Sequence, residues 1–122
     1  MQGGKYNPVL IIIAAIALGG AYALSSQRAA EPEVIRITAK RFEYNPPRIE
    51  LRQGVPVILE LTALDRLHGF SIPDLDLRAD VLPGQTVQVE LLPKKAGAYP
   101  FLCDIFCGEG HDEMSGIIVV RD

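Results

Sequence analysis

The sequence contains no tryptophan, and its 122 residues include only two cysteines, two histidines and two methionines, one of which is Met1. Basic residues are also few, because residues 31–122 have 10 basic and 15 acidic side chains, a formal charge of −5. Without a basic stripe, nucleic-acid binding is not indicated. The chain also has no phosphate-binding glycine loop and no serine–histidine–aspartate set, so hydrolytic catalysis is not indicated either.

The scarce metal-binding side chains are concentrated in one short segment, residues 103–114. It holds both cysteines, the only internal methionine and one histidine, at spacings of four, four and three residues: Cys103, Cys107, His111 and Met114. The other histidine, His68, lies 35 residues before Cys103. Thiolate, imidazole and thioether groups are ligands of soft and borderline metals, copper above all. Two extracytoplasmic cysteines could instead form a disulfide, but the combination favours a metal site in a glycine-containing loop.

The N-terminal part, residues 1–30, differs in character from the rest. Every residue from 9 to 24 is apolar or glycine, and no charge occurs between Lys5 and Arg28. A helix over this uncharged stretch would be roughly 33 Å long, enough to cross a hydrocarbon core of about 30 Å. A cleaved signal peptide is the alternative, although its apolar region is usually shorter, about 7–15 residues. We therefore expect one transmembrane anchor with a linker at residues 1–30, and a separate domain at residues 31–122 outside the inner membrane.

Residues 31–122 show the short alternating segments of an all-β domain. Six strands are predicted, either because apolar residues alternate with polar ones or because an apolar run ends at a turn. They lie at residues 34–39, 48–52, 57–62, 86–91, 99–103 and 116–120. Including a short segment at residues 42–44, where the parity changes as at a bulge or bend, we expect about seven strands and no amphipathic helix. We expect residues 73–80 to be irregular and His68 to end a strand. This pattern predicts a β-sandwich or Greek-key barrel.

The ligand segment then joins the last two strands, so its side chains can meet His68 at one end of the sandwich. Two imidazoles, one thiolate and a weak thioether already make a mononuclear blue-copper set: His68, His111, Cys107 and Met114. Cys103 is surplus to that set. A second thiolate in the same loop can bridge to a second copper ion, with one imidazole on each metal.

This arrangement resembles the CuA domain of cytochrome c oxidase subunit II, and the related domain of nitrous-oxide reductase. The resemblance extends from about Ile37 to Val120 and rests on the Cys-x3-Cys-x3-His-x2-Met motif with its distant histidine. It is supported by the segments at residues 41–46, 65–70, 81–84 and 97–99. Among these proteins the chain is most similar to the short, single-helix subunit II of B-family haem–copper oxidases. The resemblance implies an all-β, cupredoxin-like Greek-key sandwich preceded by one transmembrane helix.

The resemblance also implies a role for each motif residue in a binuclear copper site. Cys103 and Cys107 would bridge two copper ions, and His68 and His111 would bind one each. Met114 would be the weak ligand of one ion, and the backbone carbonyl of Ile105 that of the other. Many family members have glutamate where this chain has Ile105. An isoleucine can offer the carbonyl but no magnesium ligand, so we expect no magnesium ion there.

The function implied is electron transfer, without a catalytic centre in this chain. A c-type cytochrome would be the donor, and a haem-bearing oxidase subunit I in the inner membrane the acceptor. The alternatives are a free-standing, membrane-tethered CuA electron carrier and a periplasmic copper-binding or delivery protein.

Two further expectations concern the surroundings of the metal. Asp65, three residues before His68, is a candidate hydrogen-bond partner of that imidazole, since metal-bound histidines usually donate their other N–H to an oxygen. A turn or surface position is the alternative for Asp65. The donor would dock either on an acidic rim formed by Asp104, Glu109, Asp112 and Glu113, or through apolar residues that include Phe106.

Overall fold

The computed structural model describes residues 31–122, which form nine β-strands and two short 3-10 helices. Alternating side chains explain the longer strands, because one face of each is covered and the other meets solvent. In β4, for example, every second residue from Val57 to Ala63 is buried. The predicted transmembrane segment lies outside the described residues. Within residues 31–122, no helix is long and apolar enough to cross a membrane.

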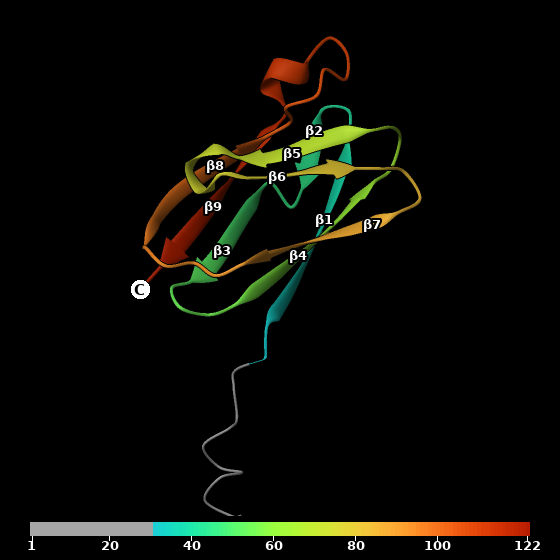
Figure 1. Ribbon diagram of the computed structural model, residues 1–122. Coiled ribbons are helices and arrows are strands. Elements are labelled where there is room, and N and C mark those ends of the chain that lie inside the picture. Colours follow the sequence, from blue (N-terminus) through green and yellow to red (C-terminus); the bar gives the residue numbers. More distant parts are fainter. Residues whose placement is uncertain (1–30) are drawn as a thin grey trace, which may run out of the picture. The chain divides into compact units, whose positions relative to one another are not determined.

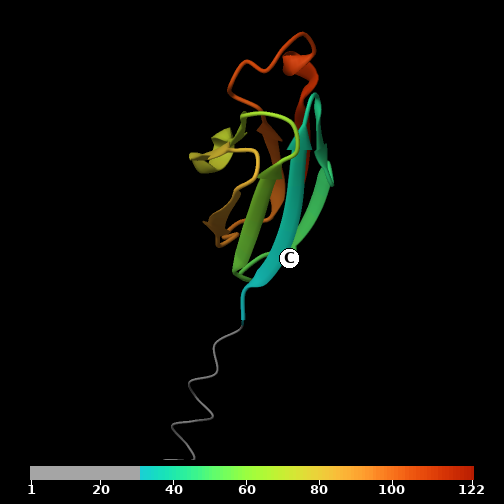
Figure 2. The ribbon, with the colours of Figure 1, turned by 90° about the vertical axis from the view of Figure 1, so that its right-hand side faces the viewer.

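The strands form two sheets that pack face to face (Figures 1 and 2). The first sheet has the order β2-β1-β4-β7, from strands Glu43–Asn45, Glu33–Lys40, Val57–Ala63 and Thr86–Leu91. The second has the order β3-β9-β8-β5-β6, from strands Arg48–Arg52, Ser115–Arg121, Gly97–Leu102, His68–Ile72 and Leu77–Val81. The chain passes repeatedly between the sheets, so β1 pairs with β4 and β3 with β9 in parallel. The predicted all-β sandwich is confirmed.

The core between the sheets is apolar and includes three aromatic rings. Tyr44, Phe70 and Phe101 pack with ring centroids 5.0–5.8 Å apart. Cys103, Cys107, His68 and Met114 extend this core toward one end of the sandwich. There the segment between β8 and β9 projects beyond the strands, drawn in orange-red in Figure 1.

Two details of the expected strand layout were wrong, and the expected bulge or bend before Tyr44 is a turn. His68 begins β5 rather than ending a strand, and β5 is buried on both faces, so it has no alternating pattern. Residues 73–80 are not wholly irregular, because the 3-10 helix Pro73–Leu75 is followed by β6, an edge strand. The parity change before Tyr44 comes from a two-residue turn at Arg41 and Phe42, after which β2 runs back along β1.

Candidate metal centre

His68 presents one free ring nitrogen to the interior at the ligand end of the sandwich. Its side chain is fully buried, and its Nε2 lies 2.7 Å from Oδ1 of Asp65. An ionised carboxylate only accepts hydrogen bonds, so Nε2 bears the proton and Nδ1 bears the lone pair. Nδ1 is buried and has no hydrogen-bond partner within the described structure. Buried polar atoms are rarely left unpaired, so a lone pair held this way fits a metal ligand.

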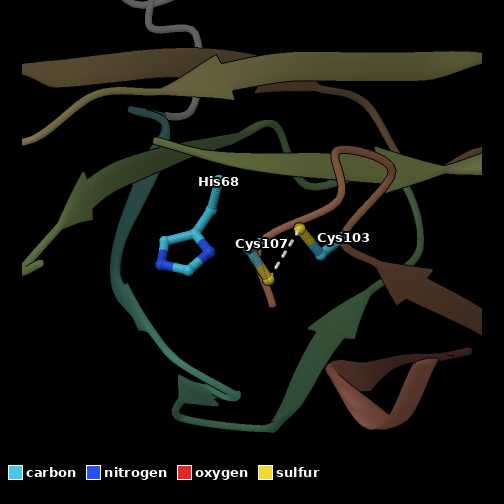
Figure 3. Close-up of side chains that lie close together, drawn as sticks. All are labelled: His68, Cys103 and Cys107. Atoms are coloured by element: carbon cyan, nitrogen blue, oxygen red, sulfur yellow. Dashed lines mark hydrogen bonds between the residues drawn. The ribbon is translucent and has the colours of Figure 1, made fainter. Parts of the chain in front are cut away.

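Both cysteines lie beside this imidazole (Figure 3). The ligand atoms of His68, Cys103 and Cys107 are all within 4.8 Å of one another, and the two sulfur atoms are 4.0 Å apart. Both thiols are buried and free, so the alternative of a disulfide is not what the structure shows. Burial and the neighbouring Cys103 raise the pKa of the Cys107 thiol, whereas the charges of Arg66 and Arg41 lower it.

The remaining predicted residues come to the same place. Around Cys107 Sγ, His111 Nδ1 lies 3.6 Å away and Met114 Sδ lies 3.9 Å away. The carbonyl oxygen of Ile105 lies 3.1 Å from Cys103 Sγ. The structure thus brings all six predicted residues together, with His68, Cys103, Cys107 and Met114 buried and His111 and Ile105 half-buried.

Local backbone chemistry explains how a twelve-residue loop gathers these groups. Gly108 and Gly110 have φ values of 130° and 104°, which side chains with a Cβ rarely adopt. These turns lead into the 3-10 helix His111–Glu113, and the N–H of Cys103 donates to the carbonyl of Met114 over 3.1 Å, which closes the loop at its base.

Gly69 of β5 supports the Cys103 side of the loop. Its N–H donates to Cys103 Sγ at 3.4 Å, and its carbonyl accepts a hydrogen bond from the buried hydroxyl of Tyr44 at 2.6 Å. Burial, followed by the charges of the nearby thiols, raises the pKa of Tyr44. A Cβ at Gly69 would overlap the carboxylate of Asp104 and lie 3.0 Å from the Asp104 backbone nitrogen, so any larger residue would require Asp104 to move.

Asp65 joins three parts of the site, which sequence reasoning had only partly anticipated. Besides the His68 imidazole, it accepts the backbone N–H groups of Arg41 and Arg66, each at 2.8 Å. Partial burial opposes ionisation of Asp65, but these three hydrogen bonds prevail and lower its pKa to about 2. The expected contact between Asp65 and His68 is therefore present.

The other side of the loop is held by residues that sequence reasoning had given no role. Arg41 Nε and Arg66 Nη1 both donate to the carbonyl of Cys107, over 3.0 and 3.4 Å. The Phe42 ring packs so closely against Gly108 and Gly110 that a Cβ at Gly110 would lie 2.9 Å from it. The two arginines lie 66 and 41 positions from Cys107 in the sequence, so no local motif could reveal these contacts.

Only part of the acidic rim is without an ion pair in residues 31–122. Arg78 of β6 makes a two-point ion pair with Asp104 at 2.7 and 3.1 Å, and this pairing lowers the pKa of Asp104. Glu109, Asp112 and Glu113 have no ion pair within the described part of the chain. Phe106, at the tip of the loop, is 72% exposed and lies 5.7 Å from the His111 ring, centroid to centroid.

A thiolate, imidazole and thioether donor set at one end of a two-sheet β-sandwich defines a class of copper-binding β-sandwich proteins. The chain belongs to the cupredoxin-like domain family, whose sequence profile matches residues 9–120.

Comparison with known proteins confirms the resemblance to cytochrome c oxidase subunit II. The chain is 35% identical to cytochrome c oxidase subunit 2 of Thermus thermophilus over 88 residues, which is 72% of this chain. It spans 65% of the length of that relative, and 52% of the length of a second cytochrome c oxidase subunit 2 from the same species.

Two solved structures share the fold. The periplasmic domain of cytochrome oxidase subunit II from Bradyrhizobium japonicum has a TM-score of 0.69 and 17% identity, covering 78% of this chain and 87% of that one. A chain of a haem–copper terminal oxidase dimer has a TM-score of 0.67 and 18% identity, covering 98% of this chain and 100% of that one. At these identities the likeness concerns the fold alone.

Proposed function

We propose that this chain is the electron-entry subunit of a haem–copper terminal oxidase, a subunit II or subunit II-like protein with a binuclear CuA centre. The observation that supports it best is the buried cluster of His68, Cys103 and Cys107, whose ligand atoms lie within 4.8 Å of one another. The unpartnered Nδ1 of His68 supports the fit of this cluster to a metal ion.

Six residues would hold the two copper ions. Cys103 and Cys107 would supply thiolates to both ions, and His68, through Nδ1, and His111 would supply one imidazole to each. The Met114 thioether and the Ile105 carbonyl would be the weak ligands. The surplus cysteine supports two ions rather than one, because the other four side chains already complete a mononuclear set.

When bound, the copper pair would supply one-electron transfer with little change in geometry. The chain's own contribution is to fix the ligands. Asp65 holds the His68 ring in the Nε2–H tautomer, and Gly69 donates to the Cys103 sulfur. Burial of both cysteines and of Met114 limits the access of water to the sulfur ligands.

The partners follow from the same proposal. A c-type cytochrome donates the electron, and a haem-bearing subunit I receives it. The apolar stretch at residues 9–24 anchors the chain in the inner membrane, with the copper domain on the periplasmic side. Ile105 provides no magnesium ligand at the junction. Copper delivery is less well supported, because three sulfur ligands are buried in a loop closed by the bond between Cys103 and Met114.

Rapid mixing of the copper-loaded full chain, in mild detergent, with a reduced basic c-type cytochrome tests this function. We expect oxidation of the cytochrome in step with loss of the visible absorption of the copper centre. The matched control is Cys103→Ser, which keeps the four side chains of a mononuclear set. Failure of the wild-type protein to oxidise the cytochrome, or equal behaviour of the Cys103→Ser variant, would contradict the proposal.

A further inference from the structure

Two cationic side chains converge on the backbone of one proposed ligand. Arg41, from the turn between β1 and β2, and Arg66, from the segment before β5, both donate to the Cys107 carbonyl. We call them the arginine pair. Within residues 31–122 neither has a carboxylate within 4.0 Å of its side chain. Arg36, Arg48, Arg78 and Arg121 all do, and the exposed Arg52 is the other arginine without one.

The position of Arg66 is unusual for an unpaired cation. Its side chain is half-buried, and its Nε is buried without a hydrogen-bond partner in the described part of the chain. Burying a charge without a counter-ion is unfavourable, so buried charges are normally paired. One negative charge nearby is the Asp65 carboxylate, which accepts the backbone N–H groups of both arginines. Another is the Cys107 thiolate, since the charges of both arginines act on this thiol and it must be deprotonated when it binds a metal.

We propose that the arginine pair sets the reduction potential of the copper centre, holding it above the value that the ligands alone would give. This inference rests on the proposed function. A reduced centre has one positive charge fewer than an oxidised one. Fixed cations beside it therefore stabilise the reduced form more than the oxidised form, which raises the potential. Arg41 and Arg66 would not bind the metal themselves. They would hold the Cys107 backbone in position and change the reduction potential through their charge.

Partial burial makes this effect stronger for Arg66 than for Arg41, which is exposed. The hydrogen bonds hold the guanidinium groups at fixed positions, and the half-buried side chain of Arg66 is screened by salt much less than an exposed charge would be. By contrast, Arg52 is exposed and ends β3, which runs parallel to β9 and away from the ligand loop. Arg52 thus offers a control with the same loss of charge at the far end of the sandwich.

The experiment is a redox titration of the copper-loaded full chain, followed by its visible absorption. The variants are Arg41→Gln, Arg66→Gln, Arg66→Lys and the control Arg52→Gln. We expect Arg66→Gln to weaken the equilibrium constant for reduction roughly tenfold, a fall of about 59 mV for one electron, and Arg41→Gln, at an exposed residue, to give a smaller fall. Arg66→Lys keeps the charge and should recover most of the loss. Arg52→Gln should leave the potential unchanged.

Three outcomes would overturn the inference. One is a wild-type potential in both Arg41→Gln and Arg66→Gln, and another is an equal fall in Arg52→Gln. The third is a folded Arg66→Lys protein that no longer binds copper, since the guanidinium would then serve only to shape the loop. A wild-type protein without a two-copper spectrum would be a failure of the proposed function itself, recognised before any variant is compared.

Discussion

Removing the carboxylate of Asp65 tests how the fold prepares His68 for a metal. Asp65→Ala deletes three hydrogen bonds, from His68 Nε2 at 2.7 Å and from the N–H groups of Arg41 and Arg66 at 2.8 Å each. Loss of an oxygen that orients a metal-bound imidazole typically weakens metal binding about 10- to 100-fold, or about 1.4–2.7 kcal/mol. Because His68 is fully buried, its unpaired N–H should also destabilise the metal-free fold by about 1–3 kcal/mol.

Three measurements check this prediction: a competition titration with a copper chelator, chemical denaturation of the metal-free chain, and the nitrogen chemical shifts of the His68 ring. Asp65→Asn keeps one acceptor oxygen, so it should lose less affinity than Asp65→Ala and preserve the Nε2–H tautomer. Asp74→Asn, at an exposed aspartate of the first 3-10 helix, is the control. Affinity within about threefold of wild type, with an unchanged tautomer in Asp65→Ala, would refute the reasoning.

Other consequences concern the support of the loop and its docking surface. Tyr44→Phe removes the hydroxyl that donates to the Gly69 carbonyl at 2.6 Å, so chemical denaturation should show a free energy of unfolding lower by about 1–3 kcal/mol. An unchanged denaturation midpoint would contradict this prediction. Gly69→Ala places a methyl group against Asp104, so we expect a free energy of unfolding lower by about 1–3 kcal/mol and a perturbed copper spectrum. A native spectrum and native stability would show instead that the loop moves aside without cost. If the acidic rim steers a basic cytochrome, the second-order rate should fall as salt rises from about 0.01 to 0.15 M; a flat rate would favour apolar docking through Phe106.

The strands that alternation predicted are those whose two faces differ in burial, such as β4 and β7. Alternation failed as a guide in strands whose burial does not follow that simple pattern or whose flanking residues conceal it. In β5 four of five residues are buried, so periodicity could not place His68 at its start. In β6 the burial does alternate, with Leu77 and Ala79 half-buried and Val81 buried, but this short edge strand directly follows a proline and two aspartates. β5 is therefore defined by its neighbours in the second sheet rather than by its own sequence.

The candidate site divides in the same way. Cys103, Cys107, His111 and Met114 are close in sequence, so their spacing alone indicated a common site. Their supports come from distant parts of the chain and become neighbours only on folding. The arginine pair reaches Cys107 from 66 and 41 residues away, and Arg78 reaches Asp104 from 26 residues away. Charges counted along the loop therefore suggested a more uniformly acidic surface than the fold provides.

The most direct test of the central claim is the electron paramagnetic resonance spectrum of the copper-loaded full chain, taken with its copper content. The account predicts two copper ions per chain and a seven-line hyperfine pattern, because one unpaired electron would be shared by two equivalent ions bridged by Cys103 and Cys107. One copper ion per chain with a four-line pattern would contradict it, and would assign the site to a single copper bound by His68, Cys107, His111 and Met114.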